Sequence, residues 1–154
     1  MGQGVLLLSL SSAARKIIGE FVAKALGLSF FNIDREIIFY LARADNLLNH
    51  NVKTYDQAEK FIINKILKEK QGVYVCSYDV YSRNKTLFSA LDKFYIYLSS
   101  KQLENFNDDD YLINKLALID RNKILQNECE VINVPEFDKE KISDIIIKKI
   151  RKKQ

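Results

Sequence analysis

The chain has 154 residues, a length that suits one domain of ordinary size and is short for two. Apolar residues make up 47% of it and charged residues 29%, a balance that is typical of globular domains and argues against a disordered chain. The longest apolar run near the start, Val5–Leu8, is far below the ~18–20 residues of a membrane span and lacks the flanks of a signal peptide. We therefore expect one cytoplasmic domain over residues 1–154, with no membrane partner.

The formal charge of +4 is distributed unevenly along the chain. Five of the 24 lysines and arginines lie in a basic C-terminal tail, residues 148–154, which leaves 19 basic against 20 acidic residues elsewhere. Because a nucleic-acid-binding domain usually carries a basic face over its fold, we expect no nucleic acid partner and interpret the tail as a solvated segment.

The first elements are a strand and a helix. Val5–Leu10 is a continuous apolar run, typical of a strand buried on both faces. Ser11 and Ser12 can cap a helix over Ala13–Leu26, which Gly27 would end as a left-handed cap. The spacing predicts that the inward face of this helix carries Ile17, Ile18, Phe21, Val22, Ala25 and Leu26.

The remaining chain continues the alternation. We expect further strands at Ser29–Ile33, Val73–Ser77, Phe94–Leu98 and Glu130–Val134. We expect further helices at Asp34–Leu48, Tyr55–Lys70, Ser82–Leu91, Asp108–Gln126 and Lys139–Lys152. The third helix would carry Phe61, Ile62, Ile66 and Leu67, and the last would turn Ile142, Ile145, Ile146 and Ile150 inward.

Strands that alternate with helices predict an α/β fold with three α/β/α layers and a five-stranded parallel sheet. Ligands of such sheets bind at the carboxyl ends of the strands. The segments to consider for a site are therefore Ser9–Lys16, Asn32–Arg35 and Ser77–Ser82.

The string LLLSLSSAARKIIGEFVAKALGLSFFNID, residues 6–34, resembles the opening of the shikimate kinases, which are small P-loop phosphotransferases. Gly19, Ala23–Leu28, Phe30 and Asp34 match that family in content and spacing, and Arg121 matches an arginine before the last strand. The resemblance implies a P-loop kinase sheet, with ATP and Mg²⁺ as cofactors and shikimate as substrate.

The phosphate-binding segment departs from the family pattern G-x-x-x-x-G-K-[ST]. Ser9 and Ala14 stand at the two glycines, Arg15 at the lysine and Lys16 at the magnesium-binding hydroxyl. A P-loop needs its glycines because the backbone must turn tightly and aim its N–H groups at the phosphates. The segment is thus a degenerate Walker A motif.

Other family positions are also changed. Asn32 replaces the first acid of D-x-D, and Ile62 replaces the arginine that binds the substrate carboxylate. Ser77, Tyr78 and Asp79 replace three glycines after the third strand. The lid segment between Leu98 and Arg121 is shortened and lacks the arginine motif of the family.

Few candidate site residues remain. Asp34 and Arg121 could bind a small hydroxylated carboxylate; alternatively, Asp34 caps its helix and Arg121 is a surface or paired charge. Ser11, Ser12, Arg15 and Lys16 could bind a nucleotide or another anion at a helix N-terminus; alternatively, the two cations are solvated. Arg15 and Asp34 would be the catalytic residues of an active enzyme.

No metal site or nucleophile is expected. We interpret Asp108–Asp110 as the acidic first turn of a helix and His50 as a loop residue without ligand neighbours. Cys76 is interpreted as a small buried side chain, and the tyrosines of the third and fourth strands as packing residues.

The sequence predicts a shikimate-kinase-like pseudoenzyme without phosphotransfer activity, which would act by binding a ligand or a protein partner. The alternative is a divergent active kinase that phosphorylates shikimate with ATP, in aromatic amino-acid biosynthesis. The isoleucine-rich basic helix at Lys139–Lys152 is either a packing helix or a surface for a partner.

Overall fold

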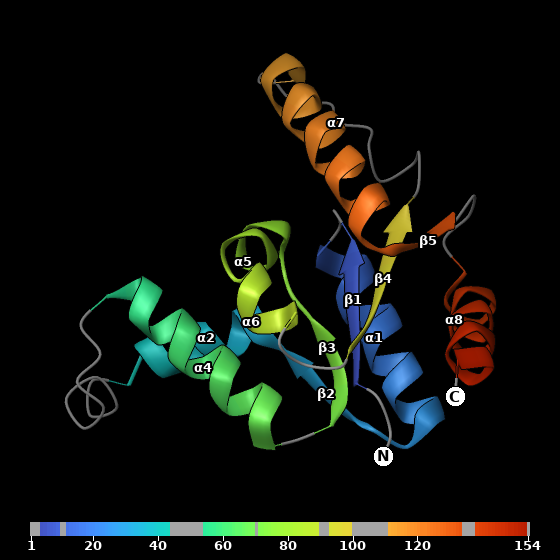
Figure 1. The fold of residues 1–154 in the computed structure, drawn as a ribbon, viewed down its shortest axis with the longest axis horizontal. Helices are drawn as coiled ribbons and strands as arrows, with labels where there is room; N and C mark the ends of the chain where they lie inside the picture. Colours follow the sequence, from blue (N-terminus) through green and yellow to red (C-terminus); the bar gives the residue numbers. More distant parts are fainter. Residues whose placement is uncertain are drawn as a thin grey trace.

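The computed structural model describes residues 4–9, 12–43, 54–69, 71–89, 93–99, 111–133 and 138–153. Its strands are β1 (Gly4–Ser9), β2 (Ser29–Asn32), β3 (Gly72–Val75), β4 (Lys93–Ser99) and β5 (Glu130–Asn133). Its helices are α1 (Ser12–Leu26), α2 (Ile33–Leu41), α4 (Tyr55–Glu69), α5 (Tyr78–Arg83), α6 (Lys85–Ser89), α7 (Tyr111–Glu128) and α8 (Lys139–Lys153) (Figure 1). No helix of the described part is both long and apolar enough to cross a bilayer.

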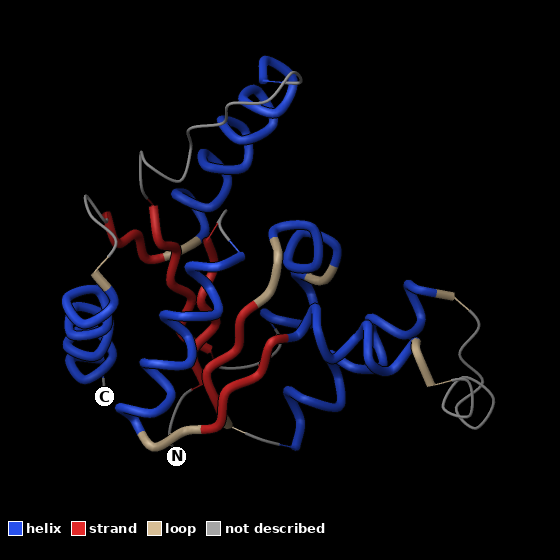
Figure 2. Tube along the Cα trace, turned by 180° about the vertical axis from the view of Figure 1, so that it is seen from behind, coloured by secondary structure: helices blue, strands red, loops and turns tan. Residues whose placement is uncertain are grey.

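The five strands form one parallel sheet in the order β2-β3-β1-β4-β5, with β1 in the middle (Figure 2). Every residue of β1 is buried, which explains why its sequence is a continuous apolar run rather than an alternating one. The α/β class and the five-stranded parallel sheet are confirmed.

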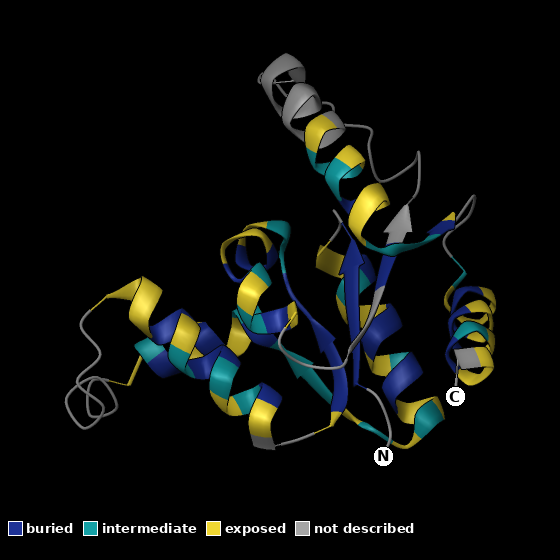
Figure 3. Cartoon of the chain, in the orientation of Figure 1, coloured by how far each residue is buried: buried dark blue, intermediate teal, exposed yellow. Residues whose placement is uncertain are grey.

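The sheet separates two apolar cores, because successive side chains of a strand point to opposite faces. Val5 and Leu7 of β1 belong to the core beneath α1 and α8, whereas Leu6 and Leu8 belong to the core beneath α2 and α4. Figure 3 shows the consequence, with buried positions on the sides of the helices that face the sheet and exposed positions on their outer sides. The three layers are thereby confirmed.

Two predicted inward isoleucines are exposed instead. Ile17 is 40% exposed and Ile145 43%. In α8 the buried stripe runs through Ile142, Ser143, Ile146, Ile147 and Ile150, so Ile145 lies on the far flank of the helix. A spacing of three or four residues is compatible with two neighbouring rows of side chains along a helix. Packing against the sheet decides which of the two rows is buried.

The prediction was also wrong for Ala25, which is exposed at the edge of the buried face of α1. Some boundaries shift as well: Ile33 begins α2 instead of ending β2, and β3 ends at Val75. The helix expected to start at Ser82 is two short helices, α5 and α6, of which the first starts at Tyr78 because Ser77 caps it. The basic residues through 153 form the last turns of α8.

Several expectations fall outside the described residues. They concern Leu10, Ser11, Leu48, His50, the lid segment between β4 and α7, Asp108–Asp110 and Val134.

Two glycines at α1 meet local requirements that a side chain would violate. Gly27 has a φ of 67°, and the Leu28 N–H donates to the Ala23 carbonyl at 2.9 Å, so it ends the helix as predicted. At Gly19 a Cβ atom would stand 2.6 Å from Phe30 Cε1 and 2.8 Å from Val75 Cγ1. This second glycine therefore allows α1 to approach the sheet.

Ser143 offers a test of the packing on the α8 side. Its side chain is fully buried, and its hydroxyl has no hydrogen-bond partner among the described residues. Since an unsatisfied buried hydroxyl is costly, we expect Ser143→Ala to raise the free energy of unfolding by about 1–2 kcal/mol in urea titrations. Ser82→Ala changes an exposed helical serine and measures the contribution of helix propensity. A loss of stability in Ser143→Ala would contradict this packing.

Candidate functional site

The candidate site lies where β1, β2 and β3 end. The strands are in register, with Asn32 beside Val75 and Val75 beside Leu7, so their carboxyl ends reach the same edge of the sheet. The residues that follow these ends come together there, as expected for a parallel sheet.

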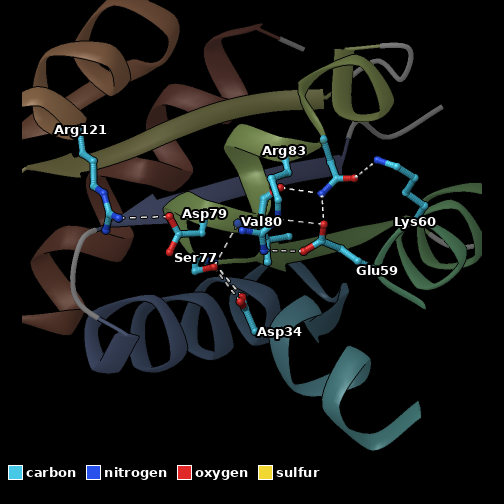
Figure 4. Close-up of polar contacts among 9 residues, drawn as sticks. Asp34, Glu59, Lys60, Ser77, Asp79, Val80, Arg83 and Arg121 are labelled. Atoms are coloured by element: carbon cyan, nitrogen blue, oxygen red, sulfur yellow. Dashed lines mark hydrogen bonds and ion pairs between the residues drawn. The ribbon is translucent and has the colours of Figure 1, made fainter. Parts of the chain in front are cut away.

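Asp34 and Ser77 make the central polar contact of this edge (Figure 4). Asp34 Oδ2 accepts a hydrogen bond from the Ser77 N–H at 2.7 Å, and Asp34 Oδ1 accepts one from the Ser77 hydroxyl at 2.7 Å. Ser77 Oγ in turn accepts from the Val80 N–H at 3.3 Å and so caps α5. One carboxylate thus fixes the end of β3 and the start of the next helix.

The interpretation that Asp34 caps α2 is wrong. The N-cap is Asn32, whose side-chain oxygen accepts from the Arg35 N–H at 3.4 Å. Asp34 follows in the first turn of α2, where its side chain is turned toward β3.

The segment at the phosphate-binding positions is short and partly helical. β1 continues through Ser9 and α1 begins at Ser12, so only residues 10 and 11 connect them. Arg15 Nη1 donates to the Ser9 carbonyl at 2.7 Å, across the start of the helix. Burial lowers the pKa of the Arg15 guanidinium, and the nearby Asp34 carboxylate partly opposes that effect. The solvated interpretation is therefore wrong for Arg15, whereas Lys16 is exposed.

These residues do not fit MgATP in the way that a P-loop holds it. Positions 12–14 are helical, and the side chain of Ala14 is packed with 3% exposure where the family pattern has a bare backbone. Lys16 brings an ammonium where the pattern supplies a hydroxyl for magnesium. Among the described residues no cluster of three or more His, Cys, Asp or Glu side chains is placed to hold a metal ion.

Arg121 of α7 lies at the start of α5. Its Nη2 atom is 3.1 Å from Asp79 Oδ1, and its guanidinium carbon is 5.0 Å from the centre of the Tyr78 ring. The interpretation of Arg121 as a paired charge is confirmed. Three residues replace the glycines of the family pattern after the third strand. Ser77 caps α5, the ring of Tyr78 lies beneath the Arg121 guanidinium, and Asp79 forms the ion pair with Arg121.

A buried acid that the sequence analysis did not single out is Glu59 of α4, which is 1% exposed. Its carboxylate accepts from Arg83 Nη2 at 2.8 Å and Nε at 3.2 Å, and from Asn84 Nδ2 at 2.9 Å. Burial alone would raise the pKa of Glu59, but the hydrogen bonds from Arg83 and Asn84 lower it. The sequence does contain a sign that this acid is buried, because Glu59 stands three residues before Ile62 on the predicted apolar face of its helix.

Glu128 ties the end of α7 to α5 and α6. Its carboxylate accepts from the Tyr81 hydroxyl at 2.6 Å and from Lys85 Nζ at 2.7 Å, and these bonds hold the pKa of Glu128 below its usual range against the opposing effect of burial.

Both cysteines are free. Burial raises the pKa of the Cys76 thiol well above its ordinary value and that of Cys129 to about 12. The interpretation of Cys76 as a buried packing residue is confirmed, because a thiolate nucleophile needs a lowered pKa.

Solved structures with this architecture include a shikimate kinase from Acinetobacter baumannii in complex with shikimate, at a TM-score of 0.76 and 13% identity. That match covers 100% of this chain and 96% of the other. The chain has the shikimate kinase fold. A shikimate kinase from Bacteroides thetaiotaomicron matches with a TM-score of 0.69 at 13% identity, covering 97% of this chain and 98% of its own.

The same fold is shared with kinases of other substrates. A dephospho-CoA kinase from Campylobacter jejuni matches with a TM-score of 0.58 at 15% identity, covering 99% of this chain and 98% of its own. The sequence itself matches no protein-family model and no curated protein. The shikimate kinase fold is therefore shown by the structure alone.

The contact between Asp34 and Ser77 predicts a stability effect. Asparagine keeps one acceptor oxygen in place of two, so one of the two hydrogen bonds donated by Ser77 is lost, and we expect Asp34→Asn to lower the free energy of unfolding by about 1–3 kcal/mol. Asp56→Asn, another acid in a helix first turn, is the matched control. Equal effects of the two changes in urea unfolding would show that the Ser77 contact stabilises nothing.

Glu59 predicts an acid-dependent stability. Because folding lowers its pKa, its contribution is complete above about pH 4.3, the ordinary glutamate value, and is lost as the pH falls through the lower folded value. Glu59→Gln should reduce the free energy of unfolding by about 2 kcal/mol at neutral pH, since Arg83 is left without its carboxylate. The Glu59→Gln variant should also lose less free energy of unfolding than the native chain when the pH is lowered. A Glu20→Gln variant, which changes an exposed glutamate, should lose as much as the native chain. A Glu59→Gln variant with the pH profile of the native chain would contradict the pairing.

Proposed function

We propose that this chain is a shikimate-kinase-like protein that has lost phosphoryl transfer and acts by binding a small ligand or a protein partner. The observation that carries the proposal is the connection between β1 and α1. It is two residues long and lacks glycine, and Arg15 of α1 donates to the carbonyl of Ser9, the last residue of β1.

Phosphoryl transfer depends on positioning and charge stabilisation by a phosphate loop, a lysine and magnesium. Here the helix starts inside the phosphate-binding segment, and the Arg15 guanidinium at the lysine position is already bonded to the backbone. The loss of one such contributor costs about 10²–10³ in rate, and several are replaced together.

The two residues that match the family's substrate-binding positions are also engaged within the chain. Asp34 is bonded twice to Ser77, and Arg121 is paired with Asp79. The pair of Arg121 and Asp79 is exposed, so it is worth only about 0–1 kcal/mol and can open for a ligand. Asp34 is held more firmly, because a ligand hydroxyl would compete with two short hydrogen bonds.

The alternative function is that of a divergent active kinase. One observation favours it: burial lowers the pKa of the Arg15 guanidinium, but the Asp34 carboxylate lies close enough to oppose part of that effect, so an acid and a cation remain together at the carboxyl ends of the strands. In that case Arg15, Lys16 and Asp34 would serve MgATP-dependent phosphorylation of shikimate.

Calorimetric titration with ATP separates the two proposals. We expect no heat of binding up to millimolar ATP, with or without Mg²⁺ and shikimate, because the loop that would receive the phosphates is replaced by helix. The Acinetobacter baumannii shikimate kinase, titrated in the same way, is the positive control for the fold. Magnesium-dependent binding near micromolar affinity would overturn the proposal and would require turnover assays of Arg15→Ala and Asp34→Asn.

A reconstructed loop tests whether this segment is the cause. The quadruple change Ser9→Gly, Ala14→Gly, Arg15→Lys and Lys16→Ser restores G-x-x-x-x-G-K-S at its position. We expect this variant to gain magnesium-dependent ATP binding that the native chain lacks.

A further inference from the structure

The outer side of α8 carries a row of lysines with one isoleucine among them. The helix packs beside α1 at the rim of the molecule, and Figure 3 shows exposed positions along the side that is turned away from the sheet. Lys141, Ile145, Lys148 and Lys152 share this side, because they follow one another at spacings of three or four residues. All four are exposed, and we call them the α8 row.

The positive charge of α8 exceeds what the chain neutralises. The helix has seven lysines and arginines but only two acids, Glu140 and Asp144. Among the described residues, its one ion pair joins Lys149 Nζ to Glu130 Oε1 at 3.1 Å. The three lysines of the α8 row form no ion pair within that part of the chain. Such an excess on an exposed helix attracts an anionic partner.

Packing within the chain does not account for Ile145. The buried stripe on the other side of α8 already supplies the apolar contacts of the helix with the sheet. Ile145 lies instead among cations, since Lys141, Lys148 and Lys149 stand three or four residues from it along the helix. The α8 row therefore offers one apolar contact surrounded by positive charges.

The charge and the isoleucine together select the class of partner. A phosphate backbone or a lipid headgroup would neutralise the lysines but offers no apolar contact to Ile145. Insertion into a bilayer would need a wide apolar face, and that of α8 is buried against the sheet. An acidic amphipathic helix meets both requirements, because it presents carboxylates and an aliphatic side chain at the spacing of the α8 row.

We propose that the α8 row is the docking surface for an acidic amphipathic helix of a partner protein. The inference rests on the proposed function, since it names the partner class of a protein that binds instead of transferring phosphate. It places that partner on the helix layer and not at the carboxyl ends of the strands.

The test uses a fluorescein-labelled synthetic peptide of glutamate and leucine at helical spacing, titrated with the full-length chain. We expect a saturable rise in anisotropy with micromolar affinity that weakens as salt is added, and shifts of the α8 backbone amides in ¹⁵N spectra. Lys148→Glu should weaken binding by about tenfold, because it removes an attractive charge and adds a repulsive one. Ile145→Ser should weaken it by about fivefold, because the leucine of the peptide loses its apolar contact.

Two variants outside α8 serve as matched controls. Lys65→Glu makes the same change of net charge at an exposed lysine of α4, and Ile38→Ser removes an exposed isoleucine of α2. Both should leave the affinity for the peptide unchanged. The four substituted positions are exposed, so the buried stripe of α8 stays intact in every variant.

Several results would overturn the proposal. The peptide could fail to bind, or Lys65→Glu could weaken binding as much as Lys148→Glu, which would indicate a general attraction to a basic chain. Equal binding of a peptide with serine in place of leucine would remove Ile145 from the surface. Tighter binding of poly(U) RNA or of phosphatidylserine vesicles would assign the lysines to a phosphate-bearing partner. No nucleotide is present in these titrations, so their failure leaves the ATP calorimetry as an independent test of the proposed function.

Discussion

The carboxylate of Asp34 accepts both hydrogens that Ser77 can donate, and the geometry of this whole sheet edge depends on that contact. It joins the segment after β2 to the segment after β3. The same Ser77 hydroxyl accepts from Val80 N–H, so it also sets where α5 begins and how the helix leaves the sheet. Because α5 carries Asp79 and Arg83, both ion pairs at this edge are placed by the serine that Asp34 holds.

The start of α1 follows from a different constraint. Glycines leave a backbone free to form an open loop, whereas Ser12 and the alanines after it favour helix as soon as the strand ends. The buried side chain of Ala14 then fixes the helix against the sheet. Arg15, at the following position, donates back to the carbonyl of the buried Ser9, which gives this backbone acceptor at the end of β1 a side-chain donor. The absence of glycine from residues 9–16 and the start of α1 at Ser12 are thus the sequence and the structural side of the same feature.

The sheet was predictable from the sequence because strands buried on both faces must be apolar throughout, as β1 is. The side-chain contacts of the edge were not predictable. Glu59 belongs to an apolar helix face by spacing, and only the fold brings Arg83 from another helix to neutralise it. Asp34 is an acid near a helix start, for which capping was a reasonable prediction, yet the neighbouring strand offers two better donors. Ile145 was misplaced because helical spacing leaves the direction of packing open.

An edge that binds charged ligands needs cations whose charge is not cancelled by the protein itself. In this chain the guanidinium of Arg121 faces Asp79, and that of Arg15 faces a carbonyl with Asp34 nearby. The guanidinium of Arg83 is shared between the buried carboxylate of Glu59 and the side chain of Tyr55. Each of these three arginines joins two elements of the fold: Arg15 joins α1 to β1, Arg121 joins α7 to α5, and Arg83 joins α5 to α4. Their charges are therefore used first to hold the sheet edge and its helices together.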